Sequence, residues 1–296
     1  MTSTTTSAPL TSMPTTAAAP ERTTRRPGTG TVLRWEIAKL VAQARSRYAL
    51  LVCLIAPIAI VLVFHAQQQT PSDTIYGRQI HTSGYAGPLF ILAFGSQWIF
   101  PILAALVAGD IFANEDQHGT WKTILTRSVT RSQIFWAKTL AATMFTLVSM
   151  VVLAASTIVS SLLIIGSQPL TGLSGQAIPS GTAFPLVLAS WATALAPQVG
   201  FTALSILLSV KTRNPAAGVA APVALALIMQ LIGTLGGIDL TRRFLLTTPL
   251  DSWHGLLTEH RFYGPLTFGL AVSAGWTAVC LACAYVSLRR RDITGG

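Results

Sequence analysis

The stretch DIFANEDQHGTWKTILTRSVTRSQIFWAK, residues 110–138, decides how this chain is organised. It is the only long charged segment that lies between apolar spans of the sequence. A polar segment bounded by apolar runs of membrane-spanning length predicts a loop at the surface of a bilayer. Its charged residues are Asp110, Glu115, Asp116, Lys122, Arg127, Arg131 and Lys138.

The first half of this stretch predicts a short helix on the membrane surface. Gly119 ends the helix that descends from the bilayer, and Thr120 can cap a new one. The apolar face of that new helix carries Trp121, Ile124 and Leu125, and its polar face carries Lys122, Thr123 and Arg127. The alternative interpretation is a solvated loop that only obeys the rules of membrane topology.

The second half predicts a helix that enters the next span. Thr130 and Gln133 have the spacing of a capping box, so we expect this helix to begin near Arg131 and to continue through Lys138.

Composition places the chain in the membrane. Its 296 residues are 51% hydrophobic and only 10% charged, whereas about 25% of residues are charged in ordinary soluble domains. The net charge of +10 comes from basic residues beside apolar spans rather than from a basic patch interleaved with aromatic residues. This pattern is typical of bilayer orientation and argues against nucleic-acid binding.

The region before the first span divides into two parts. Residues 1–31 are rich in Thr, Ser, Ala and Pro, which predicts a disordered cytoplasmic tail. Residues 32–47 predict an amphipathic helix in the membrane interface. The apolar positions that carry this pattern are Leu33, Ile37, Leu40, Val41, Ala44 and Tyr48.

Six apolar runs predict six transmembrane helices, which makes this an all-α integral membrane protein with a six-span domain over residues 48–292. Each run holds the ~20 residues needed to cross a bilayer core, where only helices satisfy the backbone of such segments. We place the spans at about 48–65, 87–109, 137–166, 184–210, 215–236 and 265–288.

The basic residues predict the orientation. With the N-terminus inside, 16 of the 20 Lys and Arg residues lie on the cytoplasmic side. This excess follows the positive-inside rule, so we expect both termini and the 110–138 stretch to be cytoplasmic.

The external segment 237–264 contains a candidate helix. Thr248 can cap it, Pro249 suits its first position, and Trp253, Leu256 and Leu257 share one face. We expect this helix to rest on the membrane surface or to dip into it. Nearby His254, Glu259 and His260 lack metal-site spacing and are interpreted as a satisfied surface cluster.

The spans carry no deep charged residue, which argues against an ion-coupled transporter or a selective ion channel. Their mid-membrane polar residues are Gln97, Gln198 and Gln230. These are candidates for lining a translocation path, and the alternative is interhelical hydrogen bonding. Pro197 next to Gln198 should kink the fourth span and free a carbonyl.

The chain lacks the sequence features of an enzyme. It contains no phosphate-binding G-x-x-x-x-G-K-[ST] motif, no nucleophile elbow and no metal site, and we predict no cofactor. The three cysteines fall in apolar spans, where Cys280 and Cys283 lack partners for zinc. Any vectorial work must therefore take its energy from a partner.

The 110–138 stretch resembles a pattern in permeases of the type 2 ATP-binding-cassette (ABC) exporter family. These permeases carry an acidic residue, a Gly-Thr pair, a Leu, an Arg after a turn and a Lys that enters the third span. The matching residues here are Glu115, Gly119, Thr120, Leu125, Arg131 and Lys138. The Pro common in the family's turn is absent, since residues 127–130 read RSVT. The layout, from an interfacial helix to a basic end closed by Asp292, is also similar over residues 32–292.

The resemblance implies the permease subunit of an exporter in the cell membrane. Two copies, or this chain and a similar one, would pair around a central path, and separate ATPase subunits would dock below. Segment 114–126 would be the coupling helix in a groove of the ATPase. The residues expected to take part are Glu115, Asp116, Gly119, Thr120, Trp121, Ile124, Leu125, Arg127, Arg131 and Lys138.

The charge-free spans favour an amphipathic substrate such as a drug, a peptide antibiotic or a lipid-linked compound. Two other functions stay open. One is a membrane anchor or sensor that recruits a cytoplasmic partner, and the other is a membrane-embedded enzyme that modifies lipids.

Overall fold

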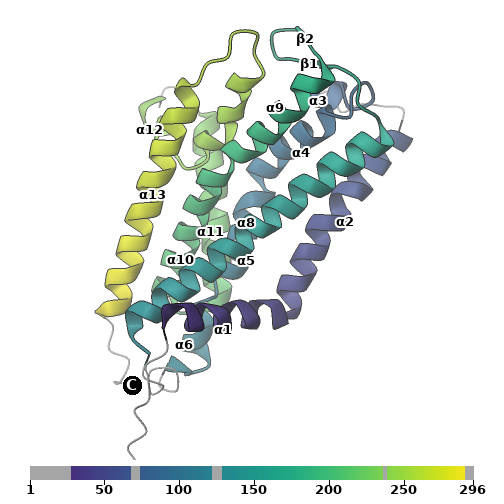
Figure 1. Ribbon diagram of the computed structural model, residues 1–296. Helices are drawn as coiled ribbons and strands as arrows, with labels where there is room; N and C mark the ends of the chain where they lie inside the picture. Colours follow the sequence, from purple (N-terminus) through teal and green to yellow (C-terminus); the bar gives the residue numbers. More distant parts are fainter. Residues whose placement is uncertain (1–27, 68–73, 122–128, 236–238, 291–296) are drawn as a thin grey trace, which may run out of the picture.

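The computed structural model describes residues 28–67, 74–121, 129–235 and 239–290. Long helices run side by side between two ends of the molecule (Figure 1). At one end, α1 (Thr29–Ala42) lies across the long helices, and we call this the α1 end. At the other, the hairpin end, strands β1 (Leu170–Thr171) and β2 (Ala177–Ile178) pair antiparallel, and they form the only sheet of the described residues.

Among the described residues, five helical segments are long and apolar enough to cross a membrane. This confirms the prediction of an all-α integral membrane protein. The five are α2 (Ala44–Ala66), α8 (Arg131–Ile164), the consecutive α9 and α10 (Ser180–Thr193 and Leu195–Thr212), α11 (Pro215–Thr234) and α13 (Gly264–Arg289).

The second predicted span, 87–109, is a broken helix rather than a continuous one. α4 (Ala86–Gln97) and the helical stretch that begins with α5 (Ile99–Ala108) meet at an angle of 56° at Trp98. Proline lacks an N–H and its ring collides with the carbonyl four residues earlier. For Pro101 that carbonyl belongs to Gln97, which is where α4 ends. Taken as one span, the bent pair brings the number of candidate spans to six.

The fourth span is interrupted for the same reason. α9 ends at Thr193, four residues before Pro197, and α10 resumes at Leu195. The kink predicted at Pro197 thus corresponds to this interruption, where the carbonyl of Thr193 lacks its helical partner.

The interfacial helix differs from its prediction in length and in buried face. α1 ends at Ala42 instead of residue 47, because Gln43 adopts an extended conformation before α2 begins. Its buried residues are Val32, Glu36 and Leu40. Of these, only Leu40 belongs to the predicted apolar face. Glu36 is turned inward, and its partners are described below.

The middle of the segment 237–264, residues 248–257, is largely buried within the protein. A 3₁₀ helix, η1, covers Thr248–Leu256, so Thr248 is its first residue and not the predicted cap. Trp253 and Leu257 are fully buried, and the Trp253 ring packs against that of Tyr76 on α3 (Ile75–Arg78). η1 packs mainly against α9 and α13, which gives its apolar face a protein environment.

The loops at the hairpin end are tied together by the same segment. The carbonyl of Leu257 accepts hydrogen bonds from the Leu173 N–H at 2.9 Å and from the Gln176 side chain at 3.0 Å. A short helix, α12 (Asp239–Arg243), lies before η1 at this end.

Candidate functional site

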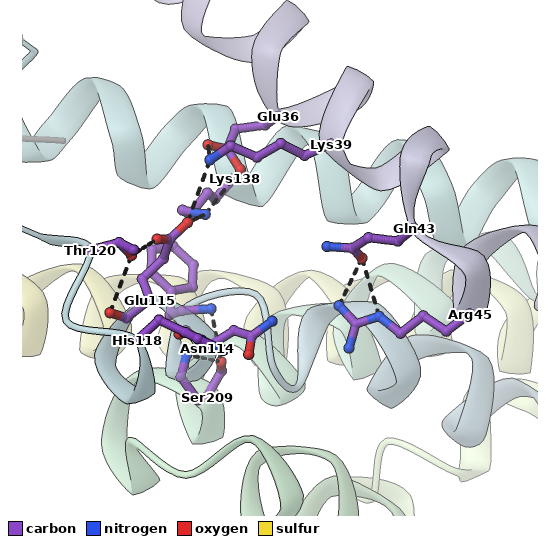
Figure 2. A network of polar contacts seen from close by, with 12 residues as sticks. Glu36, Lys39, Gln43, Arg45, Asn114, Glu115, His118, Thr120, Lys138 and Ser209 are labelled. Carbon is purple, nitrogen blue, oxygen red and sulfur yellow. Dashed lines mark hydrogen bonds and ion pairs between the residues drawn. The ribbon is translucent and has the colours of Figure 1, made fainter. Parts of the chain in front are cut away.

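The candidate site is the α1 end of the molecule, where the 110–138 stretch meets α1, α8 and α10. A turn over residues 109–112 follows α5 and leads into the short α6 (Ala113–Gln117). The hydroxyl of Ser209 on α10 accepts hydrogen bonds from the N–H groups of Phe112 and Ala113, both at 3.1 Å (Figure 2). A side chain almost 100 residues away therefore caps the N-terminus of α6.

α6 ends as the sequence predicted, at a glycine in the left-handed region. Gly119 has a φ of +61°, a conformation that side chains with a Cβ rarely adopt. Thr120 then turns back on α6, because its hydroxyl donates to the Glu115 carboxylate and its N–H donates to the Glu115 carbonyl at 3.1 Å. Thr120 thus holds Glu115 in place.

A buried lysine lies at the centre of the site (Figure 2). The ammonium of Lys138 on α8 is 2.9 Å from Glu36 on α1 and 2.9 Å from Glu115 on α6, and its side chain is 2% exposed. Lys39 adds a second cation, 2.9 Å from Glu36 and 3.5 Å from Glu115. We call these four residues the ionic cluster. It joins three elements that are far apart in sequence.

The charges of the ionic cluster lower the pKa of Glu115. This residue lies outside the predicted span 87–109. Burial by itself raises the pKa of Glu115. Lys138, the Thr120 hydroxyl and Lys39 outweigh burial and lower the pKa to about 2. Glu115 is therefore an anion at physiological pH, as its ion pair with Lys138 requires.

A second ion pair lies beside the cluster. Arg45, near the start of α2, pairs with Asp110 and also donates two hydrogen bonds to the Gln43 side chain, at 2.9 and 3.1 Å. Asp110 is 3% exposed. This pair fixes the junction between α1 and α2 to the end of the second span.

Trp121 is part of the protein interior in this arrangement. It is 4% exposed, and its ring stacks on Phe112 with centroids 6.4 Å apart. Phe112 in turn packs against Phe135 on α8 at 5.7 Å. The anchor role expected of Trp121 toward a partner is not available to a side chain buried in this way. Three other expected contact residues, Ile124, Leu125 and Arg127, lie outside the described residues.

The start of α8 has the predicted cap. The Thr130 hydroxyl accepts from the Gln133 N–H, the Gln133 side chain accepts from the Thr130 N–H, and α8 begins at Arg131. The guanidinium of Arg131 donates to the carbonyl of Arg289 at the end of α13 at 3.1 Å. Arg131 thus connects the third span to the last one. Asp116, the remaining expected residue, lies on α6 and is half-buried.

The three candidate path residues occupy different environments. Gln97 is exposed where α4 breaks. Gln198 is fully buried, and its amide donates to the Phe100 carbonyl at 3.0 Å. This is an interhelical hydrogen bond, which was the alternative to lining a translocation path. Gln230 is half-buried and lines a cavity of about 320 Å³ at the hairpin end.

Sequence reasoning missed several members of the site. Glu36, Lys39 and Arg45 were only left outside the apolar positions predicted for residues 32–47, and Asp110 and Ser209 received no role. One signal was available: a lysine at the start of an apolar span needs counter-charges if it is buried. The sequence does not say which acids supply them.

The geometry can now be compared with known proteins. A protein-family model described as "ABC-2 family transporter protein" matches residues 32–233. That range includes α1, the ionic cluster and the spans through α11. Among curated proteins, none matches the chain.

Proposed function

We propose that this chain, which belongs to the ABC-2 family of transporter proteins, is the permease subunit of an ATP-driven exporter and that a separate subunit hydrolyses the ATP. The family match covers more than half of the chain, and the spans provide the membrane part of such a machine. No phosphate-binding motif for ATP occurs in the sequence.

The observation that carries the proposal is the burial of Lys138 between Glu36 and Glu115. In our proposal, segment 114–126 is the coupling helix that docks on the ATPase. A force on this segment reaches α8 through the Glu115–Lys138 pair and reaches α1 through Glu36. Ion pairs that are buried resist separation, because a lone buried charge costs several kcal/mol. The cluster therefore suits the transmission of a rigid-body movement into the bundle.

The burial of Trp121 changes the details of the docking surface. Trp121 supports the segment from inside by stacking on Phe112, while Ile124, Leu125 and Arg127 remain the proposed contacts with the ATPase. Asp116 and Arg131 set the register of the segment through their charges.

We place the permease in the cell membrane with both termini and the α1 end in the cytoplasm, on the basis of the distribution of Lys and Arg. A second copy or a similar permease completes the translocation path. The substrate is amphipathic, because spans without a charged residue deep in the membrane suit neither a small ion nor a proton relay.

Co-purification tests the docking role. The chain is purified in mild detergent from its native host, and the recovered ATPase is compared for wild type, for Trp121→Ala with Glu115→Ala, and for Ile124→Ala with Leu125→Ala. The matched control is Ile102→Ala, at an apolar position that is 46% exposed. Size-exclusion chromatography reports whether each variant keeps its fold.

We expect the ATPase to accompany the wild type and the control and to be lost from both double variants. Failure of any ATPase to accompany a folded wild-type protein removes the energy source and favours the membrane anchor or the lipid-modifying enzyme. To test the alternative of a lipid-modifying enzyme, the residues to replace are His254, Glu259 and His260.

A further inference from the structure

A cavity of about 390 Å³ lies at the hairpin end, far from the ionic cluster, between η1, the end of α12 and the start of α13. Its volume falls in the range of about 300–1,000 Å³ that is typical of small-ligand sites. Apolar atoms form most of its surface, and two residues of opposite charge also line it. The lining residues include Arg243, Pro249, Asp251, Pro265, Phe268 and Gly269.

The two charges are not paired with each other or with another ionic side chain of the described chain. Asp251 and Arg243 take part in none of the ion pairs found there, whereas the neighbouring Arg242 pairs with Asp239 at 3.6 Å. The imidazole of His254 is bonded to the Asp251 backbone carbonyl at 2.7 Å and acts on the carboxylate only through its charge. An unpaired anion and an unpaired cation therefore face one partly apolar space.

Asp251 is accessible from a second side as well. The cavity of about 320 Å³ that contains Gln230 is also lined by Thr248 and Asp251. Asp251 is an exposed residue that lines both cavities. Such a position leaves room for a ligand cation without a rearrangement of the backbone.

The cavity borders an exposed apolar surface of α13. Phe268 lines the cavity and is 43% exposed, and its ring packs against that of Phe244 with centroids 5.7 Å apart. α13 is one of the candidate membrane spans, so the exposed side of Phe268 faces lipid near the end of the span. An apolar chain that leaves the cavity can lie along this surface.

We propose that this cavity binds the head group of a zwitterionic amphiphile. Asp251 receives an ammonium group, Arg243 receives a phosphate or carboxylate, and the apolar chain lies over Phe268. A purely anionic head group meets repulsion from Asp251, and a purely cationic one meets repulsion from Arg243. Phosphatidylethanolamine in the bilayer and an exported zwitterionic compound share this chemistry.

Binding can be measured without ATPase or transport, so the result is independent of the proposed function. The full chain is reconstituted in nanodiscs of phosphatidylglycerol, which carries no ammonium. The probes are dihexanoyl phosphatidylethanolamine and dihexanoyl phosphatidylglycerol, and Trp fluorescence reports binding because Trp253 lies beside the site in η1. We expect the ethanolamine probe to bind about tenfold more tightly than the glycerol probe.

Substitutions distinguish the roles of the two charges. Asp251→Asn should remove the preference for the ethanolamine probe, and Arg243→Gln should weaken the binding of both probes. Asp239→Asn and Arg261→Gln are the matched controls, since these residues lie at the same end but are not among those that line the cavity. Equal affinity of the two probes for the wild type, or probe binding unchanged by both Asp251→Asn and Arg243→Gln, overturns the proposal.

A second arm distinguishes the two sources of the ligand. The titration is repeated in nanodiscs that contain phosphatidylethanolamine. If the bilayer lipid itself occupies the cavity, the apparent affinity of the soluble probe falls. If the bilayer lipid does not occupy the cavity, the affinity of the soluble probe is unchanged. The site then serves a zwitterionic compound that arrives from solution or from the translocation path. Either result supports the site.

Discussion

The ammonium of Lys138 lies 2.9 Å from the carboxylate of Glu36, although the two residues are 102 positions apart in the chain. This pair fixes a helix that lies across the bundle to the start of the third span. Because Lys138 also binds Glu115, the same ammonium holds the segment proposed to meet the ATPase. The stability of the α1 end and its proposed function therefore depend on one buried cation.

Lys138→Met tests this dependence. The substitution leaves Glu36 and Glu115 in the interior with only the half-exposed Lys39 as a counter-charge. We expect a loss of about 3–5 kcal/mol in the free energy of unfolding, measured by thermal unfolding in detergent. Lys39→Met is the control and should cost less than about 1 kcal/mol, as exposed pairs do. Equal effects of the two substitutions would contradict the central role of Lys138.

The low pKa of Glu115 predicts a dependence of stability on pH. Because the folded-state pKa of about 2 is below the ordinary value of 4.5, the contribution of Glu115 is complete above pH 4.5 and is lost as pH falls toward 2. It amounts to about 3 kcal/mol, of which about half is left at pH 3. The measurement is the difference in unfolding free energy between the wild type and Glu115→Gln from pH 6 to pH 3. A difference that stays constant over this range is inconsistent with the ion pair.

Gly218 permits the contact between the second and fifth spans. A Cβ at Gly218 would overlap the carbonyl oxygen of Gly109, and a Cβ at Gly109 would overlap that of Gly218. We expect Gly218→Ala to separate α11 from the end of α5, to cost about 1–3 kcal/mol of stability and to impair transport. Gly233→Ala on the same helix is the control, because nothing lies near its Cβ position and alanine favours helix. Equal stability of the two variants would show that the helices do not meet there.

Two glutamines should respond differently to substitution. Gln198→Leu removes the buried hydrogen bond to the Phe100 carbonyl and should cost about 1–3 kcal/mol in the free energy of unfolding. Gln230→Leu, at the wall of a cavity, should change stability by no more than about 0.5 kcal/mol and should alter substrate export instead. Thermal unfolding and a vesicle transport assay separate the two effects. A Gln198→Leu variant that is stable but no longer transports would indicate that Gln198 lines the translocation path.

Local patterns in the sequence were sufficient for much of the architecture. Apolar runs of spanning length, the capping box at Thr130 and the glycine turn at Gly119 depend on neighbours within a few residues. Pro101 and Pro197 likewise act on carbonyls one turn earlier, so the breaks in the second and fourth spans have local causes. The bend at Trp98 was nevertheless not predicted, because the apolar run continues through it.

The tertiary structure decided which polar residues face inward. Glu36 is not among the apolar positions predicted for residues 32–47, yet it is buried in an ion pair with Lys138. Trp121 and Trp253 have the spacing of surface helices, yet both are buried. Trp121 stacks on Phe112, and Trp253 packs against Tyr76, which is distant in sequence. A buried charge or ring is stabilised by partners that the fold brings together across long loops. Sequence therefore determined most of the helices and the local signals at Gly119 and Thr130, and only the packing of those helices determined the ionic cluster and the cavity at the hairpin end.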